Sequence, residues 1–243
     1  LVLGLTDMCA IMAVLDRIQS TTPLLAYEFF SELAVSKVID YAGVARPFET
    51  RTPFYALVEF ERESDMTDAL VFEAVEQCME EGSVVDAVMS QSVAQARALW
   101  QLREDISETI SKWTPYKNDI SSTVSKVPEL LAAVDDVVHE NYPDWEVVWY
   151  GHIGDGNLHL NILKPENLQI DEFKERCNEV STDIFDAIKT LGGSVSAEHG
   201  VGTLKAPYLG YSKSESEIDA MRAIKAIFDP DGILNPGKVF SIA

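Results

Sequence analysis

The 243-residue sequence has few cysteines, few histidines and few basic side chains: three, four and 19 respectively. Cys9, Cys78 and Cys177 are odd in number and far apart, so we expect reduced thiols rather than a disulfide framework. The 40 acidic residues leave a formal net charge of −21. Nucleic acids and anionic membrane surfaces are themselves negative, so this charge argues against both as partners.

Long apolar runs are also missing. The most apolar stretch, residues 1–15, is broken by Asp7, and no segment approaches the roughly 18 to 20 apolar residues of a membrane span. No basic leader precedes an apolar segment, so no transmembrane segment and no secretory signal are predicted. We therefore expect a cytoplasmic protein, or a mitochondrial matrix protein in a eukaryote. The chain opens with Leu1 rather than Met, which suggests a piece of a longer protein.

A glycine-rich loop that leads from a strand into a helix is absent as well. Gly151, Gly154 and Gly156 lie between two strand-like runs, so they do not form a dinucleotide-binding fingerprint. No repeat of fixed period and no low-complexity segment is visible.

Strand-like and helix-like patterns alternate along the chain. A hairpin near residue 155 requires antiparallel pairing in part of the sheet. We therefore expect an α+β sandwich with helices on one face of a mostly antiparallel sheet. The patterns predict strands at 1–5, 26–30, 54–60, 84–89, 120–124, 145–150, 158–163 and 194–197, and helices at 7–18, 32–41, 66–81, 94–113, 128–140, 170–191 and 215–228.

The predicted hairpin carries two of the four histidines. If its loop is centred between residues 155 and 156, His152 faces His159 and Tyr150 faces Asn161, and all four side chains share one face. Opposed Cβ atoms lie about 4.5 to 5.5 Å apart, which lets two imidazoles bind one metal ion. The simpler interpretation is that the two rings only pack across the hairpin.

A third histidine follows a glutamate in a segment that ends at two glycines, Gly200 and Gly202. With the two hairpin histidines, Glu198 completes the ligand set of a catalytic divalent metal. That set suits zinc, and manganese less specifically. Neighbours on a strand point to opposite faces, but a kink at the glycines can turn His199 into the same cavity as a general base. Alternatively, the segment is an ordinary strand end with a turn.

Three motifs together resemble one family in order and spacing: Gly-His-Ile-Gly-Asp-Gly-Asn-Leu-His-Leu-Asn at 151–161, Ser-Ala-Glu-His-Gly-Val-Gly at 196–202 and Asp-Pro-Asp-Gly-Ile-Leu-Asn-Pro-Gly-Lys at 229–238. The chain resembles the C-terminal half of FAD-dependent D-2-hydroxyacid dehydrogenases of the vanillyl-alcohol-oxidase type, with D-2-hydroxyglutarate and D-lactate dehydrogenases as the nearest members. The resemblance implies that residues 1–243 are the substrate or cap domain, with a ferredoxin-like fold plus additional C-terminal helices. It also implies that the N-terminal FAD-binding domain lies outside this chain.

The resemblance assigns roles to individual residues. Ser107 stands where D-2-hydroxyglutarate dehydrogenases often have threonine, which leaves the choice of substrate open. Arg103 and Lys117 match groups that hold a substrate carboxylate, although they could instead be surface charges. The implied roles are metal binding for His152, His159 and Glu198, proton abstraction for His199, substrate binding for Arg103, Ser107, Lys117 and Asn161, and contact with FAD for Asn235 and Lys238.

The implied reaction is oxidation of a D-2-hydroxy acid to a 2-oxo acid, with the proton taken by His199 and hydride passed to FAD. The implied electron acceptor is an electron-transfer flavoprotein or a quinone, and a homodimer is expected. Two alternatives remain open. A His, His, Glu metal set can also activate water in a hydrolase, and a non-catalytic α+β binding domain would need no metal.

Overall fold

The structure, a computed structural model, describes residues 1–62 and 64–240. The chain forms two compact units. Unit 1 contains residues 1–117 and 145–168, and unit 2 contains residues 118–144 and the chain from 169 onward. In the described part of the chain, no helix is long and apolar enough to cross a membrane.

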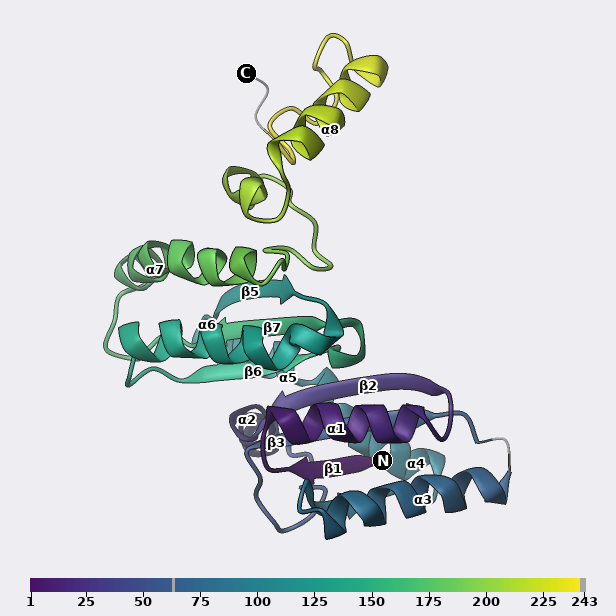
Figure 1. The fold of residues 1–243 in the computed structure, drawn as a ribbon. Helices are drawn as coiled ribbons and strands as arrows, with labels where there is room; N and C mark the ends of the chain where they lie inside the picture. Colours follow the sequence, from purple (N-terminus) through teal and green to yellow (C-terminus); the bar gives the residue numbers. More distant parts are fainter. Residues whose placement is uncertain (63, 241–243) are drawn as a thin grey trace. The chain divides into compact units, whose positions relative to one another are not determined.

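The strands form a seven-stranded sheet with the order β4-β1-β3-β2-β6-β7-β5 (Figure 1). The pairs β1–β3, β1–β4, β2–β3, β2–β6 and β6–β7 are antiparallel, which confirms the predicted α+β fold. The strands are β1 (Val2–Leu5), β2 (Leu24–Ser31), β3 (Phe54–Phe60), β4 (Val84–Val88), β5 (Tyr116–Ser121), β6 (Val147–Gly151) and β7 (Asn157–Ile162).

The α-helices and short 3-10 helices connect these strands. Unit 1 holds α1 (Met8–Gln19), α2 (Glu32–Ala42), α3 (Asp65–Glu80), α4 (Val93–Glu104), α5 (Ile106–Ile110), η1 (Ser111–Trp113) and η3 (Ile153–Asp155). Unit 2 holds η2 (Val124–Lys126), α6 (Val127–Asn141), α7 (Ile170–Thr190), η4 (Ala206–Tyr211) and α8 (Glu215–Phe228).

The first part of unit 1 has the ferredoxin-like element order β1-α1-β2-β3-α3-β4, with α2 inserted between β2 and β3. Helices α1 and α3 pack together, and the Tyr27 hydroxyl on β2 donates a hydrogen bond to the Ile11 carbonyl on α1. Successive strand residues point to opposite faces, so Glu28 points away from α1. On that second face, α2 packs with α4 and α5. Helices therefore cover both faces of the sheet here, whereas the sequence predicted helices on one face. This second layer places α4 against Glu28.

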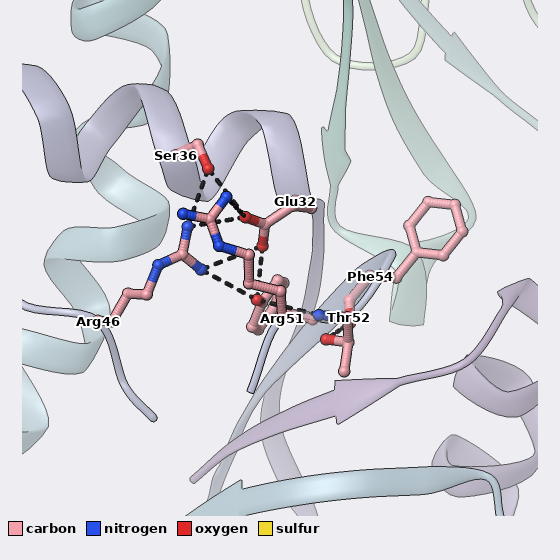
Figure 2. A network of polar contacts seen from close by, with 7 residues as sticks. Glu32, Ser36, Arg46, Arg51, Thr52 and Phe54 are labelled. Carbon is pink, nitrogen blue, oxygen red and sulfur yellow. Dashed lines mark hydrogen bonds and ion pairs between the residues drawn. The ribbon is translucent and has the colours of Figure 1, made fainter. Parts of the chain in front are cut away.

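Unit 1 also contains a polar network at the start of α2 (Figure 2). The guanidinium of Arg46 donates to Glu32 at 2.7 Å, and the Tyr55 hydroxyl donates to the same carboxylate at 2.6 Å. Burial alone would raise the pKa of Glu32, but hydrogen bonds from Arg46, Tyr55 and Ser36 hold that pKa below its usual value. This network ties the loop before β3 to helix α2.

Three predicted elements differ in the structure, and the first two are the helix at 94–113 and the strand at 120–124. The helix predicted at 94–113 divides into α4, α5 and η1. The chain turns at Asp105 (φ −77°, ψ −5°), and this turn keeps Leu102 and Ile106 buried in the same core. The strand predicted at 120–124 begins earlier, at Tyr116.

In unit 2, the strand predicted at 194–197 shrinks to one antiparallel bridge between Ser194 and Ser121. The backbone N–H of Ser196 instead donates to the Ser194 hydroxyl at 3.3 Å. A side chain has thus taken the donor that a longer strand pairing would need. The last helix, α8, begins with a capping box formed by Ser214 and Glu217.

Candidate functional site

The β6–β7 hairpin is confirmed, but its register is two residues from the predicted one. Tyr150 lies opposite His159, and Val148 lies opposite Asn161. The pairing predicted between His152 and His159 was therefore wrong. A shift of two residues keeps every side chain on its face of the sheet, so the two histidines still share one face and are diagonal neighbours.

The loop geometry explains this register. The backbone N–H of Asn157 donates to the carbonyl of His152 at 3.2 Å, and the chain between them forms η3. Gly156 has a φ of +76°, in the left-handed region that favours glycine. At Gly151, an added Cβ would lie 2.3 Å from the Asn157 carbonyl oxygen. Both glycines are therefore needed to close the hairpin this tightly.

The two hairpin rings lie close together. The ring centroids of His152 and His159 are 5.6 Å apart with an interplanar angle of 82°. The His159 ring also packs against Tyr150, with centroids 4.8 Å apart. His159 is buried, whereas the side chain of His152 is 35% exposed. One ring is thus held by packing, and the other lies at the edge of the site.

A buried ion pair lies beside His152. Glu28 accepts a hydrogen bond from Arg103 Nε at 2.8 Å, and its other oxygen lies 2.7 Å from His152 Nδ1. The Arg103 guanidinium lies over the Tyr150 ring, 4.7 Å from its centroid. Arg103 is only 8% exposed. The alternative that Arg103 is a surface charge is therefore wrong.

The other residues expected to bind substrate also belong to unit 1. Lys117 is exposed, and its ammonium donates to the Ser107 hydroxyl at 3.1 Å. Asn161 is buried, and its amide donates to the carbonyl of His159 at 3.3 Å. The structure thus brings Lys117 and Ser107 together and leaves both at the surface of the unit.

In unit 2, Asp119 holds the segment that contains Glu198 and His199. One carboxylate oxygen of Asp119 accepts the backbone N–H of Glu198 at 2.8 Å and that of His199 at 3.1 Å. The same oxygen lies 3.7 Å from His199 Nδ1. The segment is a series of bends rather than a strand, so the expectation of opposite strand faces does not apply to these two residues.

Lys205 lies near Asp119 in the same unit. Its ammonium donates to the Asn118 side-chain carbonyl at 2.8 Å and lies 4.5 Å from the centre of the Phe185 ring. Burial lowers the pKa of Lys205 to about 8, and the charge of Asp119 opposes this shift only in part. Lys205 is therefore a partly buried cation close to Asp119.

The C-terminal tail is organised by Asp229. Its two carboxylate oxygens accept the backbone N–H groups of Ile233 and Leu234 at 2.9 and 3.0 Å. Asn235 follows with a φ of +46°, and both it and Lys238 are exposed. The structure leaves both residues at the surface, and their predicted contact with FAD stays a prediction.

Sequence reasoning missed Glu28 and Asp119. Glu28 had a readable signal, because it is the one carboxylate within the apolar run of residues 26–30, and a carboxylate in a buried strand needs a partner. Asp119 had a weaker signal, since it lies among polar residues directly before the strand predicted at 120–124.

The hairpin fits a role in metal binding. A histidine that ligates a metal usually donates its other ring N–H to a carboxylate or a carbonyl, and His152 Nδ1 faces Glu28 in this way. His159 supplies a second imidazole on the same face. Imidazole nitrogens are among the donors of a catalytic divalent site.

Three D-2-hydroxyglutarate dehydrogenases match most of this chain in sequence. A D-2-hydroxyglutarate dehydrogenase of Stutzerimonas stutzeri (strain A1501) is 54% identical over 241 residues, which is 99% of this chain and 52% of that protein. One from Xanthomonas citri pv. viticola is 42% identical and covers 99% of this chain and 51% of its own. The mitochondrial D-2-hydroxyglutarate dehydrogenase of Arabidopsis thaliana is 35% identical over 89% of this chain and 38% of its own. The chain spans about half the length of the first two of these relatives.

Solved structures share the fold at low sequence identity. The structure of p-cresol methylhydroxylase with substrate bound has a TM-score of 0.65 at 14% identity and covers 99% of this chain and 52% of its own. A 4-ethylphenol oxidase from Gulosibacter chungangensis has a TM-score of 0.64 at 12% identity. The match covers 98% of this chain and 53% of the oxidase chain. The family model for FAD linked oxidases, C-terminal domain, matches residues 1–239. The resemblance seen in the three sequence motifs is thereby confirmed, and the chain belongs to the C-terminal domain family of the FAD linked oxidases.

Proposed function

We propose that this chain is the substrate-binding part of a flavin-dependent dehydrogenase that oxidises a D-2-hydroxy acid to its 2-oxo acid. D-2-hydroxyglutarate is the first candidate substrate. The observation that carries the proposal is the buried Arg103 beside His152, in a chain 54% identical to a D-2-hydroxyglutarate dehydrogenase. Arginine can grip a carboxylate with two hydrogen bonds.

We propose that His152, His159 and Glu198 hold a zinc ion, with manganese as the alternative. When bound, such an ion supplies Lewis-acid polarisation of the substrate hydroxyl. Two imidazoles and one carboxylate leave coordination positions open for substrate. The alternative in which both histidines only pack predicts no divalent metal bound at these side chains.

The protein residues perform the remaining tasks. Arg103 orients a substrate carboxylate, and Lys117 with Ser107 supplies further donors for it. His199 accepts the hydroxyl proton, and Asp119 fixes its backbone and lies 3.7 Å from its Nδ1. Asn161 supplies an amide on the same strand face as His159.

FAD would be the hydride acceptor. Asn235 and Lys238 are the residues of this chain proposed to contact it, and the rest of its site would lie in the part of the protein that precedes this chain. We further propose an electron-transfer flavoprotein or a quinone as electron acceptor, and a homodimer. The matrix location proposed for a eukaryotic form agrees with the mitochondrial relative from Arabidopsis thaliana.

The test is a panel of D-2-hydroxy acids, including D-2-hydroxyglutarate, D-lactate and glycolate, assayed by dye reduction with the full-length protein. Arg103→Lys should raise the KM for D-2-hydroxyglutarate about 10- to 100-fold, which corresponds to the roughly 1.5 to 3 kcal/mol of a hydrogen bond between charged groups. Arg97→Lys, an exposed position on the same helix, should leave KM unchanged. Turnover of esters or phosphates without flavin, and no oxidation of any hydroxy acid, would favour the hydrolase alternative.

A further inference from the structure

Glu28 stands out among the buried residues of β2. It is 5% exposed and lies between Tyr27 and Phe29, both of which are buried apolar side chains. Burying a carboxylate is costly unless each oxygen finds a donor. One oxygen receives Arg103 Nε at 2.8 Å, and the other lies 2.7 Å from His152 Nδ1. A single side chain therefore joins a proposed substrate-binding residue to a proposed metal ligand.

These contacts decide which nitrogen of the neutral His152 ring carries the hydrogen. An ionised carboxylate can only accept, so Nδ1 donates to Glu28. A guanidinium can only donate, and Arg103 Nη2 lies 3.4 Å from Nε2 of the same ring. Both neighbours thus select the tautomer with a lone pair on Nε2. The lone pair on Nε2 is the one that would bind a metal ion, in place of its contact with Arg103.

The same carboxylate fixes Arg103. It takes the Nε–H, and the Tyr150 ring supports the guanidinium plane at 4.7 Å. Nη1, and the N–H of Nη2 that does not face His152, then remain as donors for the two oxygens of a substrate carboxylate. Without Glu28, the arginine would keep its charge but lose the contact that sets its direction.

We propose that Glu28 is a positioning residue for both halves of the unit 1 site: it presents His152 Nε2 to the metal and holds Arg103 ready for the substrate carboxylate. The inference rests on the proposed function. It assigns Glu28 no contact with substrate, metal or flavin.

The chain offers a matched control at Glu32. Glu32 also pairs with an arginine, Arg46, at 2.7 Å and directly follows the same strand, as the first residue of α2 (Figure 2). The Glu32 side chain contacts Arg46, Arg51, Tyr55 and Ser36, none of which is a proposed site residue. Loss of a carboxylate from an arginine pair is therefore common to both variants, and only Glu28→Gln changes the surroundings of His152.

The experiment uses the full-length protein, stripped of metal and titrated with zinc against a chelating dye. Glu28→Gln should lower zinc affinity about 10- to 100-fold, the usual effect of removing the hydrogen-bond partner of a metal-ligating histidine. It should also raise the KM for D-2-hydroxyglutarate, whereas Glu32→Gln should leave both quantities within twofold of wild type. Equal zinc affinity in wild type and Glu28→Gln would overturn the proposal.

A second measurement covers a Glu28→Gln protein that folds poorly. In wild type labelled with 15N-histidine, the metal-free His152 ring should show the hydrogen on Nδ1 in long-range 1H–15N spectra. The opposite tautomer would overturn the inference even if no variant can be purified. If wild type binds no zinc at all, the proposed metal site fails together with this inference. If wild type binds zinc and oxidises the hydroxy acid but Glu28→Gln matches it, only the role of Glu28 fails.

Discussion

The two segments that carry the proposed site are held in different ways. In unit 1, His152, Glu28 and Arg103 are joined side chain to side chain, and two of the three are buried. In unit 2, Asp119 holds Glu198 and His199 through their backbone N–H groups, and the His199 side chain is 67% exposed. Buried side-chain contacts hold a rotamer, and the 3.7 Å contact between Asp119 and His199 Nδ1 lies at an exposed ring. The unit 1 residues are therefore the more preorganised of the two groups.

The largest expected effect follows from removing the carboxylate that joins the unit 1 residues. Glu28→Ala leaves the buried Arg103 without its counter-charge, and we expect the free energy of unfolding to fall by about 3 to 5 kcal/mol. Urea denaturation followed by circular dichroism measures the change. Arg103→Met added to Glu28→Leu should recover much of the loss, because no uncompensated buried charge remains. A loss below about 1 kcal/mol for Glu28→Ala would remove the contrast between the two units.

The corresponding change in unit 2 should cost less. Asp119→Ala removes the acceptor of two backbone N–H groups, and we expect a loss of about 1 to 3 kcal/mol. Amide hydrogen exchange should become faster at Glu198 and His199 and stay unchanged at His159. Asp136→Ala, at an exposed position in the same unit, serves as the control. Exchange that quickens equally in the β6–β7 hairpin would show that the two segments are not held independently.

The partly buried Lys205 predicts a pH dependence for unit 2. Its pKa is about 8 in the folded chain against 10.5 as the ordinary value, so between these values the unfolded state binds more protons. The contribution of Lys205 to the free energy of unfolding should therefore rise from pH 8 to about pH 10.5 and be flat below pH 7. Denaturation of wild type and Lys205→Met at pH 7, 8.5 and 10 measures it. A difference between the two proteins that does not change with pH would contradict the prediction.

The smallest expected effect concerns the reactivity of the three thiols. Each unit contains one buried cysteine. Cys78 in unit 1 and Cys177 in unit 2 are buried, whereas Cys9 is exposed. Burial raises the pKa of Cys177 to about 12 and raises that of Cys78. At pH 8 a thiol reagent should label Cys9 quickly and the other two only after denaturation. Cys9→Ser should abolish the fast phase, and a second fast thiol in native protein would mean that one unit opens readily.

Local patterns were enough for much of the fold. The strand at 54–60 and the helix at 215–228 lie where the sequence placed them, because hydrophobic period and capping residues act within one element. The hairpin between residues 150 and 161 was also correct in kind, and so was the shared face of its two histidines. A register shift of two residues leaves each side chain on the same face of the sheet.

Other features depended on contacts that no local pattern contains. The register of the hairpin was set by η3, whose tight turn moved the pairing by two residues. The strand expected at 194–197 was shortened because the Ser194 hydroxyl took the backbone N–H of Ser196. The roles predicted for Lys117, Ser107 and Asn235 stay predictions, since exposed polar residues reveal little until a ligand is bound.

The sequence by itself determined the order of strands and helices, the chemical types in the site and the family, since all of these are written in residue identity and spacing. Only the tertiary structure decided that Glu28 reaches Arg103, 75 residues away, and that Asp119 holds Glu198 across 79 residues. A buried carboxylate must find its donors wherever the folded chain brings them, so its partners depend on packing rather than on its neighbours in sequence.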